Sequence, residues 1–275
     1  IRTETDRLGD TRYRMLETIR SFAREHLSEA GEADPVHLAH GHWVTTVVQD
    51  IYKFVLSPQA AHWLDICERE HDNIRTALTW ALESHNVGLG TNIADRSWRF
   101  WEIRGYYTEA RTWLERCLEA FPDAPPRQRA LLLDGLGNIT WKQGEVVTAA
   151  RVLEESLAIW RDTGEEMALN AALSNLGAVM ERLGNLDRAE ALQREALDLA
   201  RTYGDEEDIS LTLNNLATVL WNQGDLDGAQ ELLEESLVIK RRIGNLFGLA
   251  VSLTNLAILI SGKGELDQAI SYMEE

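Results

Sequence analysis

The chain has 275 residues, 44% hydrophobic and 26% charged, which is typical of folded globular proteins and excludes collagen-like and wholly disordered chains. Asp and Glu outnumber Lys and Arg by 45 to 27, and the formal net charge of −18 disfavours non-specific binding to nucleic acids or anionic membranes. Apolar stretches such as Leu256 to Ile260 are far shorter than the ~20 residues of a membrane-spanning helix. Two cysteines do not make a disulfide framework and favour a reducing, cytoplasmic location.

The first elements predicted along the chain are a short strand and a helix. Residues 11–16 alternate between polar and apolar side chains as a strand does, and residues 17–27 have helical spacing and end before Gly31. The chain begins at Ile1 without an initiator methionine or a signal segment, and it stops at Glu275 inside a repeat. We therefore expect it to be a segment of a longer protein.

Three further helices are predicted before the glycine-punctuated part of the chain. Their apolar spacing places them at about 36–56, 59–70 and 71–85. Gly41, inside the first of these ranges, predicts a helix start or an irregularity at that point. Together these helices make residues 34–90 a helical connector.

Several stretches of the first 120 residues occur in an order that is found in one protein family. They are Tyr13-Arg-Met-Leu-Glu-Thr-Ile-Arg20 with Phe22-Ala23, Ala61-His-Trp-Leu-Asp65, Glu70-His-Asp-Asn-Ile-Arg-Thr-Ala-Leu-Thr-Trp-Ala-Leu82 and Trp98-Arg-Phe-Trp-Glu-Ile-Arg-Gly105. Together they resemble bacterial signal-transduction ATPases of the STAND/NB-ARC type, in which a nucleotide-binding domain and a winged helix precede a helical repeat array. The resemblance implies that residues 1–33 are the strand and helix that end a winged-helix domain, and that an ATPase domain lies upstream of Ile1.

Glycines divide the rest of the chain into equal segments. Gly144, Gly164, Gly184, Gly204, Gly224, Gly244 and Gly264 recur every 20 residues. Every second one opens the same local sequence, as in Gly184-Asn-Leu-Asp187 and Gly224-Asp-Leu-Asp227, so the repeat is 40 residues long. Each segment has the apolar spacing of an amphipathic helix, and a glycine can end a helix in the left-handed conformation. Because one helix pair alone leaves an apolar face uncovered, the pairs must stack into a solenoid.

Small residues recur at fixed places in these helix pairs. The motifs are Leu133-x2-Leu136-Gly137 with Gly144 and Ala149, Leu173-x2-Leu176-Gly177 with Gly184 and Ala189, Ala217 with Ala229, Ala257 with Ala269, and a diverged earlier copy from Trp98 to Pro122. This pattern resembles the tetratricopeptide repeat, and the core Asn214-Asn-Leu-Ala217 is similar to the longer-helix repeats of kinesin light chain. The resemblance implies an all-α, right-handed superhelical solenoid. Its repeats are at about 91–129, 130–169, 170–209, 210–249 and, truncated, 250–275.

No motif of catalysis or cofactor binding accompanies this pattern. The phosphate-binding signature GxxxxGK[ST] does not occur in the sequence. His37 and His40 could share a helical face as metal ligands, but no HExxH motif or Cys/His pair at metal spacing supports them. Cys67 and Cys117 lie in apolar company without a predicted base. We expect no enzyme activity, no metal and no cofactor.

The acidic residues are concentrated in the repeats. Residues 130–275 carry 11 Lys and Arg against 25 Asp and Glu, whereas residues 91–129 carry 7 against 6. This acidic half could steer a basic partner. The pairs Glu154-Glu155 and Glu234-Glu235 recur with the repeat and predict a solvated outer face rather than acid–base chemistry.

Candidate binding residues come from the tetratricopeptide resemblance, in which the first helix of each repeat lines a concave groove. Counting from the glycine that ends this helix gives Asp134, Asn138, Trp141 and Lys142, then Ser174, Ala178, Glu181 and Arg182, then Asn214, Thr218, Trp221 and Asn222, and finally Thr254, Ile258 and Ser261. Asn side chains there can pair with a peptide backbone. Trp141 and Trp221 are either aromatic anchors in the groove or residues that pack between helices.

Two hypotheses of function follow. In the first, which the family resemblance implies, the array senses a protein, peptide or small-molecule inducer and controls the upstream ATPase of a bacterial transcriptional regulator through an intramolecular contact. In the second, the array is a stand-alone adaptor that binds peptides in the same groove. Neither involves direct contact with nucleic acid or a membrane. A third hypothesis, an enzyme with a carboxylate or histidine site, lacks a supporting motif.

Overall fold

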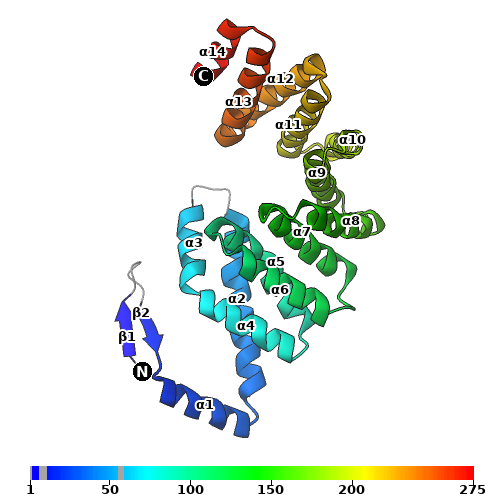
Figure 1. The fold of residues 1–275 in the computed structure, drawn as a ribbon. Helices are drawn as coiled ribbons and strands as arrows, with labels where there is room; N and C mark the ends of the chain where they lie inside the picture. Colours follow the sequence, from blue (N-terminus) through cyan, green and yellow to red (C-terminus); the bar gives the residue numbers. More distant parts are fainter. Residues whose placement is uncertain (1, 6–10, 55–58) are drawn as a thin grey trace. The chain divides into compact units, whose positions relative to one another are not determined.

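The structure, a computed structural model, describes residues 2–5, 11–54 and 59–275. Within these residues it contains two short strands and fourteen helices (Figure 1). The chain divides into two compact units, Ile1–Phe100 and Trp101–Glu275. No helix among the described residues has both the length and the apolar character needed to cross a bilayer.

The first unit opens with a small hairpin. Strands β1 (Arg2–Thr5) and β2 (Thr11–Arg14) pair antiparallel, with Arg2 opposite Arg14 and Thr5 opposite Thr11. The strand and helix expected between residues 11 and 27 are thus confirmed as β2 and α1. The helices of this unit are α1 (Glu17–Glu29), α2 (Ala33–Phe54), α3 (Ala60–Arg69), α4 (His71–Glu83) and most of α5 (Val87–Arg104). The three helices predicted for the connector correspond to α2, α3 and α4, and α2 packs against both of the others.

The prediction of a helix start or irregularity at Gly41 is wrong. Gly41 is buried in the middle of α2, which continues through it from Ala33 to Phe54. A Cβ atom at this position would lie 2.3 Å from Cδ2 of Leu89 on α5. The glycine is therefore required by the close approach of two helices and does not interrupt either of them.

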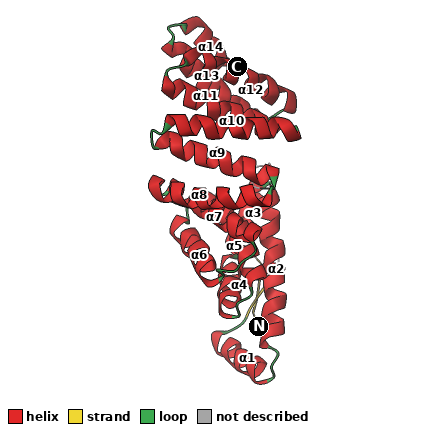
Figure 2. Ribbon diagram, turned by 90° about the vertical axis from the view of Figure 1, so that its right-hand side faces the viewer, coloured by secondary structure: helices red, strands yellow, loops and turns green. Residues whose placement is uncertain are grey.

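The second unit is a stack of antiparallel helix pairs. Its helices are the end of α5, α6 (Tyr107–Ala120), α7 (Pro126–Lys142), α8 (Val146–Thr163), α9 (Glu166–Arg182), α10 (Leu186–Tyr203), α11 (Glu206–Gln223), α12 (Leu226–Ile243), α13 (Leu246–Gly262) and α14 (Leu266–Glu274). We call α7, α9, α11 and α13 the first helices of their pairs and α8, α10, α12 and α14 the second helices. Figure 2 shows α8, α9 and α10 lying one above another, as expected for a solenoid.

Glycines end helices and allow helices to pack closely. The second helices α8, α10 and α12 end at Gly164, Gly204 and Gly244, each in the left-handed conformation with φ of 70°, 76° and 73°. Gly177 has a different role, because a Cβ there would lie 2.4 Å from Nε2 of Gln193 on α10. The small residue of the repeat motif thus lets the two helices of one pair approach each other.

The core of the second unit runs between the two helix layers. One group of buried side chains, including Leu153, Trp160 and Leu176, links α7 to α10, and another, including Leu216, Leu237 and Leu256, links α10 to α14. At about 25 cal/mol per Å² of buried apolar area, this burial is the main stabilising contribution to each joint. Each helix pair therefore depends on its neighbours for a complete core.

Candidate ligand-binding face

The first helices form the inner layer of the solenoid. Backbones of neighbouring first helices approach one another, α7 with α9, α9 with α11 and α11 with α13, in addition to packing against second helices. Neighbouring second helices are instead linked by long side chains, such as Arg161 and Glu195. The array therefore curves toward the first helices. We call the surface of these helices that faces away from the second helices the inner face.

Three predicted groove residues are buried between helices. Asn138 and Asn214 are each 8% exposed, and Ser174 is 7% exposed. Asn138 donates to the carbonyl oxygen of Asp134 at 2.8 Å, and the Oδ1 atom of Asn214 accepts from Ser252 at 3.1 Å. These side chains contact other parts of the array rather than solvent.

Asp134 also serves the packing of the array. Its carboxylate accepts a hydrogen bond from Ser156 Oγ at 2.6 Å and from the indole N–H of Trp160 at 2.8 Å, both on α8. Trp160 is fully buried, so its N–H needs an acceptor inside the protein. Asp134 supplies it.

Trp141 and Trp221 are partly buried, at the same place in their repeats. Trp141 packs against the core group around Leu176, and Trp221 against the group around Leu216. Lys142 Nζ lies 5.9 Å from the centre of the Trp141 ring. Each tryptophan thus combines packing on one side with a partly accessible surface on the inner face.

Two polar contacts cross the inner face, one between α5 and α7 and the other between α9 and α11. Lys142 Nζ lies 3.4 Å from Oε1 of Glu102 on α5, and Asn222 Nδ2 donates to Oε1 of Glu181 at 2.8 Å. Glu181 is partly buried, and this burial raises the pKa of its carboxyl, while the Asn222 hydrogen bond and the charge of Arg182 act in the opposite direction.

The other predicted groove residues lie toward solvent. Arg182, Thr254, Ile258 and Ser261 are exposed, and Ala178 and Thr218 are partly exposed. Thr218 donates to the carbonyl oxygen of Asn214 at 3.0 Å, as Thr254 does to that of Ala250 at 2.8 Å. Their hydroxyl oxygens keep acceptor capacity for a ligand.

One row of inner-face side chains did not emerge from the sequence reasoning. Asn175, Asn215 and Asn255 are spaced by 40 residues and are all partly exposed. Asn255 Nδ2 donates to Oδ1 of Asn214 at 3.2 Å. The 40-residue spacing of these asparagines was a readable signal, but the motif-based register selected their buried neighbours Ser174 and Asn214 instead.

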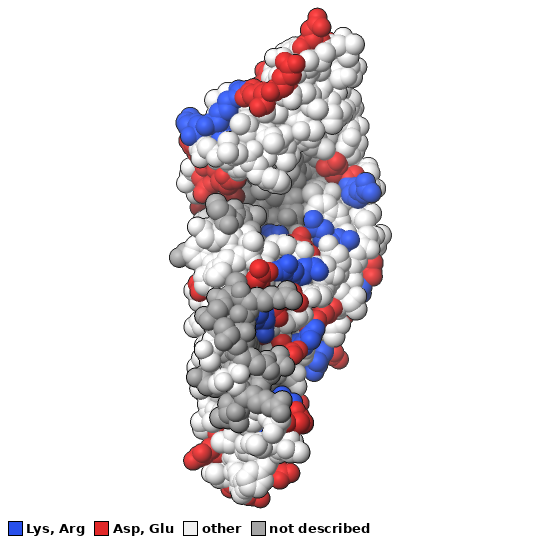
Figure 3. All heavy atoms as spheres, turned by 90° about the vertical axis from the view of Figure 1, so that its left-hand side faces the viewer, with Lys and Arg blue, Asp and Glu red and all other residues white. Residues whose placement is uncertain are grey.

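The outer layer carries a ladder of ion pairs, which includes Glu154 and Glu155 of the expected acidic outer face, with side chains 42% and 41% exposed. Glu154 pairs with Arg188 at 2.8 Å, and Glu155 pairs with Arg129 at 2.6 Å. Pairs that start from a second helix recur every 40 residues: Arg161 with Glu195, Arg201 with Glu235, and Arg241 with Glu275 directly after α14. Figure 3 draws another side of the molecule, and there too several basic side chains lie next to acidic ones.

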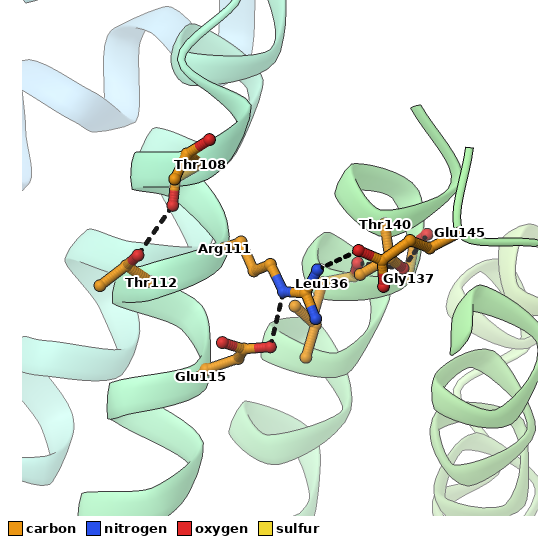
Figure 4. Close-up of polar contacts among 8 residues, drawn as sticks. All are labelled: Thr108, Arg111, Thr112, Glu115, Leu136, Gly137, Thr140 and Glu145. Atoms are coloured by element: carbon orange, nitrogen blue, oxygen red, sulfur yellow. Dashed lines mark hydrogen bonds and ion pairs between the residues drawn. The ribbon is translucent and has the colours of Figure 1, made fainter. Parts of the chain in front are cut away.

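The same kind of contact joins α6 to the first complete pair. Arg111 donates to Glu115 on its own helix at 2.8 Å and to Glu145 before α8 at 2.5 Å (Figure 4). These two carboxylates raise the pKa of the Arg111 guanidinium. The repeat's own hydrogen bonds lie close by, with Thr140 Oγ1 donating to the carbonyl oxygen of Leu136 at 2.8 Å.

The histidines and cysteines considered as reactive groups have packing contacts. His37 stacks on Trp80 with ring centres 5.7 Å apart, and His40 lies 3.3 Å from Oδ1 of Asn73. Cys67 and Cys117 are buried, and burial raises the pKa of Cys117 to about 12. At neutral pH that thiol is therefore protonated and a poor nucleophile.

Comparison with known proteins found curated relatives of similar sequence and solved structures of similar fold. The chain is 30% identical over 175 residues to a curated protein of Mycobacterium tuberculosis that is named as an HTH-type transcriptional regulator. The match covers 60% of this chain, and the chain spans about a fifth of that relative's length (20%).

Two solved structures share the fold. One is the Signal Transduction ATPase with Numerous Domains (STAND) protein with a tetratricopeptide repeat sensor from Pyrococcus horikoshii, with a TM-score of 0.66, 13% identity and coverage of 94% of this chain and 40% of that one. The other is the Rap conjugation gene regulator of plasmid pLS20 in complex with the Phr* peptide, with a TM-score of 0.57, 14% identity and coverage of 84% and 73%. The model of the MalT-like tetratricopeptide repeat region matches residues 103–275, more than half of the chain, and the chain belongs to this family.

Proposed function

We propose that this chain is the ligand-sensing array of a multidomain bacterial transcriptional regulator that works in the cytoplasm. The observation that carries the proposal is the inner face, where Trp141, Glu181 and Trp221 occupy one repeat position and stay partly accessible. The tetratricopeptide fold is typically a non-catalytic scaffold, and the 30% identical relative is named as a transcriptional regulator. The array is therefore assigned binding rather than catalysis.

Sensing requires coupling to another domain. We assign this role to a nucleotide-binding domain upstream of residue 1, which the array holds in one of two arrangements. A ligand can shift such an equilibrium only if it binds one arrangement better than the other. The fold shared with the STAND protein that has a tetratricopeptide repeat sensor supports this assignment.

The first residues fit the same proposal. We assign residues 1–33 to the end of a winged-helix domain, residues 34–90 to a connector and residues 91–275 to the array. The β1–β2 hairpin followed by α1 supports the first assignment. Leu16 and Phe22 are 48% and 60% exposed, which suits a helix that packs against further residues of such a domain.

The ligand class is supported by the fold shared with a peptide-bound Rap regulator. The Rap structure is of a complex with the Phr* peptide, and its fold is similar to that of this chain. The inner face offers asparagine amides, each with donors and an acceptor, for a peptide or small-molecule inducer. Peptide binding on the same face without a nucleotide domain would make the chain an adaptor, which is the alternative.

The experiment uses the full-length parent protein. Nucleotide binding and hydrolysis are measured for the intact parent and for a form without residues 101–275. If the array controls the nucleotide-binding domain, its removal changes hydrolysis at least tenfold in either direction. A parent that binds no nucleotide, or one whose hydrolysis is unchanged without the array, contradicts the proposal and leaves the adaptor.

A further inference from the structure

The inner face contains an internal example of how it holds a cation. Lys142 Nζ lies 3.4 Å from the carboxylate of Glu102 on α5, and 5.9 Å from the centre of the Trp141 ring. A carboxylate from one helix and an indole from the next thus flank one ammonium group. Both contacts favour a positive charge at this place, the first by charge and the second by the ring's quadrupole.

Two repeats later the same two kinds of side chain occupy the corresponding positions, and a neutral amide takes the place of the ammonium group. Glu181 on α9 supplies the carboxylate and Trp221 on α11 supplies the indole, 80 residues after Trp141. The residue after this tryptophan is Asn222, at the repeat position of Lys142. Its Nδ2 atom donates to Oε1 of Glu181 at 2.8 Å.

Burial of the Glu181 carboxylate costs part of its hydration energy. It is partly buried, and among the residues that the structure describes no Lys or Arg side chain lies within ion-pair distance of it. Asn222 donates to one oxygen of this carboxylate, and among the described residues the other oxygen accepts no hydrogen bond. A ligand cation would offset the desolvation of the carboxylate, which the neutral amide does only in part.

Other features of the same two helices favour a peptide with a basic side chain as the ligand. The partly exposed amides of Asn175 and Asn215 lie on α9 and α11 and can each donate to and accept from a peptide backbone. The repeats from residue 130 onward carry 11 basic against 25 acidic residues, which attracts a positively charged ligand.

We propose that the inner face between α9 and α11 binds a basic peptide, whose Lys or Arg side chain lies between the Glu181 carboxylate and the Trp221 ring. This inference rests on the proposed function, because it names the ligand class of the same face. Asn222 keeps its hydrogen bond to one oxygen of Glu181, and the ligand cation takes the other.

The test is a titration of the 275-residue chain, followed through the indole N–H resonances in NMR. The probe is N-acetyl-Ala-Arg-Ala-amide, and its neutral match is the same peptide with citrulline in place of arginine. We expect the arginine peptide to shift the Trp221 indole resonance and to bind at least tenfold more tightly than the citrulline peptide. Raising the salt concentration should weaken only the arginine peptide.

Two variants locate the site, and a third controls for net charge. Glu181→Gln keeps a hydrogen-bond acceptor for Asn222 and should weaken the arginine peptide at least tenfold. Asn222→Lys places the protein's own ammonium where Lys142 stands in the earlier repeat, and should abolish the shift. Glu231→Gln, on the exposed side of α12, makes the same charge change as Glu181→Gln and should leave binding within twofold of the parent chain.

Equal binding of the arginine and citrulline peptides overturns the inference, as does unchanged binding to the Asn222→Lys variant. So does a shift that appears at Trp141 but not at Trp221. These results would leave the proposed function standing if removal of the array still alters nucleotide hydrolysis by the parent. Loss of that effect, with the peptide still bound at Glu181, would refute the sensor role and keep the binding site.

Discussion

The helix pair α7–α8 and the helix pair α11–α12 have the same backbone arrangement and different polar contacts. We call them the first joint and the second joint. Between α7 and α8, Asp134 accepts hydrogen bonds from Ser156 and from the buried indole of Trp160. Eighty residues later, at the positions of Asp134 and Trp160, stand Asn214 and Lys240. Lys240 is 4% exposed, and its Nζ donates to Ser252 Oγ at 2.8 Å.

The serine between them has the same role in both joints. The Ser156 hydroxyl shares its proton between Asp134 and the carbonyl oxygen of Ala130, which lies 3.2 Å away, and Ser236 donates to the carbonyl oxygen of Ser210 at 2.7 Å. The backbone plan therefore does not depend on one particular polar pair. What each joint requires is an acceptor for every buried donor, and a carboxylate or a serine hydroxyl can supply it.

The largest effect should come from removing the buried indole of the first joint. Trp160→Ala opens a cavity and leaves Asp134 without one donor, and we expect a loss of about 3–5 kcal/mol in the free energy of unfolding, measured by denaturant titration. Trp43→Ala is the matched control, because Trp43 is 44% exposed and should cost far less. A loss for Trp160→Ala that is no larger than a small loss for Trp43→Ala would mean that the first joint does not depend on Trp160.

A change of the acceptor alone separates hydrogen bonding from packing. Asp134→Asn keeps the size of the side chain but turns one acceptor oxygen into a donor that faces other donors. We expect a loss of about 1–2 kcal/mol in the free energy of unfolding. If the variant is as stable as the parent chain, the amide at Asn214 and the carboxylate at Asp134 are interchangeable, and the two joints differ less than their contacts indicate.

The second joint should respond to pH. Burial lowers the pKa of Lys240, and the charge of Glu207 opposes this shift without reversing it. Because the folded pKa lies below the unfolded value, the folded state binds the proton less well, and the free energy of unfolding should rise as pH increases from the folded pKa toward the unfolded one near 10.5.

Lys240→Met removes this titration and the cost of burying the charge. We expect the variant to be more stable than the parent chain by about 1 kcal/mol at pH 7, with the difference shrinking as the pH is raised. Thermal unfolding of both chains between pH 7 and 10 measures this difference in stability. A variant that is less stable than the parent at every pH would show that Lys240 stabilises its joint.

The smallest effect should come from the outer ion pairs. Arg201 and Glu235 are joined at 2.8 Å but are 48% and 44% exposed. Arg201→Ala should therefore lower the free energy of unfolding by no more than about 0.5 kcal/mol, and high salt should abolish the difference. A loss above 2 kcal/mol would show that the ladder, rather than the core, sets the stability of the repeats.

The sequence was sufficient for the repeat because the repeat has a strong local cause. Gly164, Gly204 and Gly244 end their helices in the left-handed conformation, as their spacing predicted. The tetratricopeptide pattern also located the first helices. The 20-residue spacing reports backbone geometry, which every copy must satisfy.

The details of the inner face could not be predicted in the same way. Asn214 and Asn215 are neighbours of the same type, yet the first is buried and the second is partly exposed. A difference of one residue turns a side chain by about 100° around a helix, and the packing of the next pair decides which one remains accessible. Gly41 was misread for a related reason, since its partner Leu89 is distant in sequence.

The most direct test of the sensor role is amide hydrogen exchange in the full-length parent protein, compared between its ATP-bound and ADP-bound forms. Coupling between two sites is reciprocal, so if a ligand on the array alters the nucleotide-binding domain, the bound nucleotide must alter the array in return. We predict that exchange in α9 and α11 differs between the two nucleotide states. Identical exchange throughout residues 101–275, in a parent that binds both nucleotides, would contradict the account.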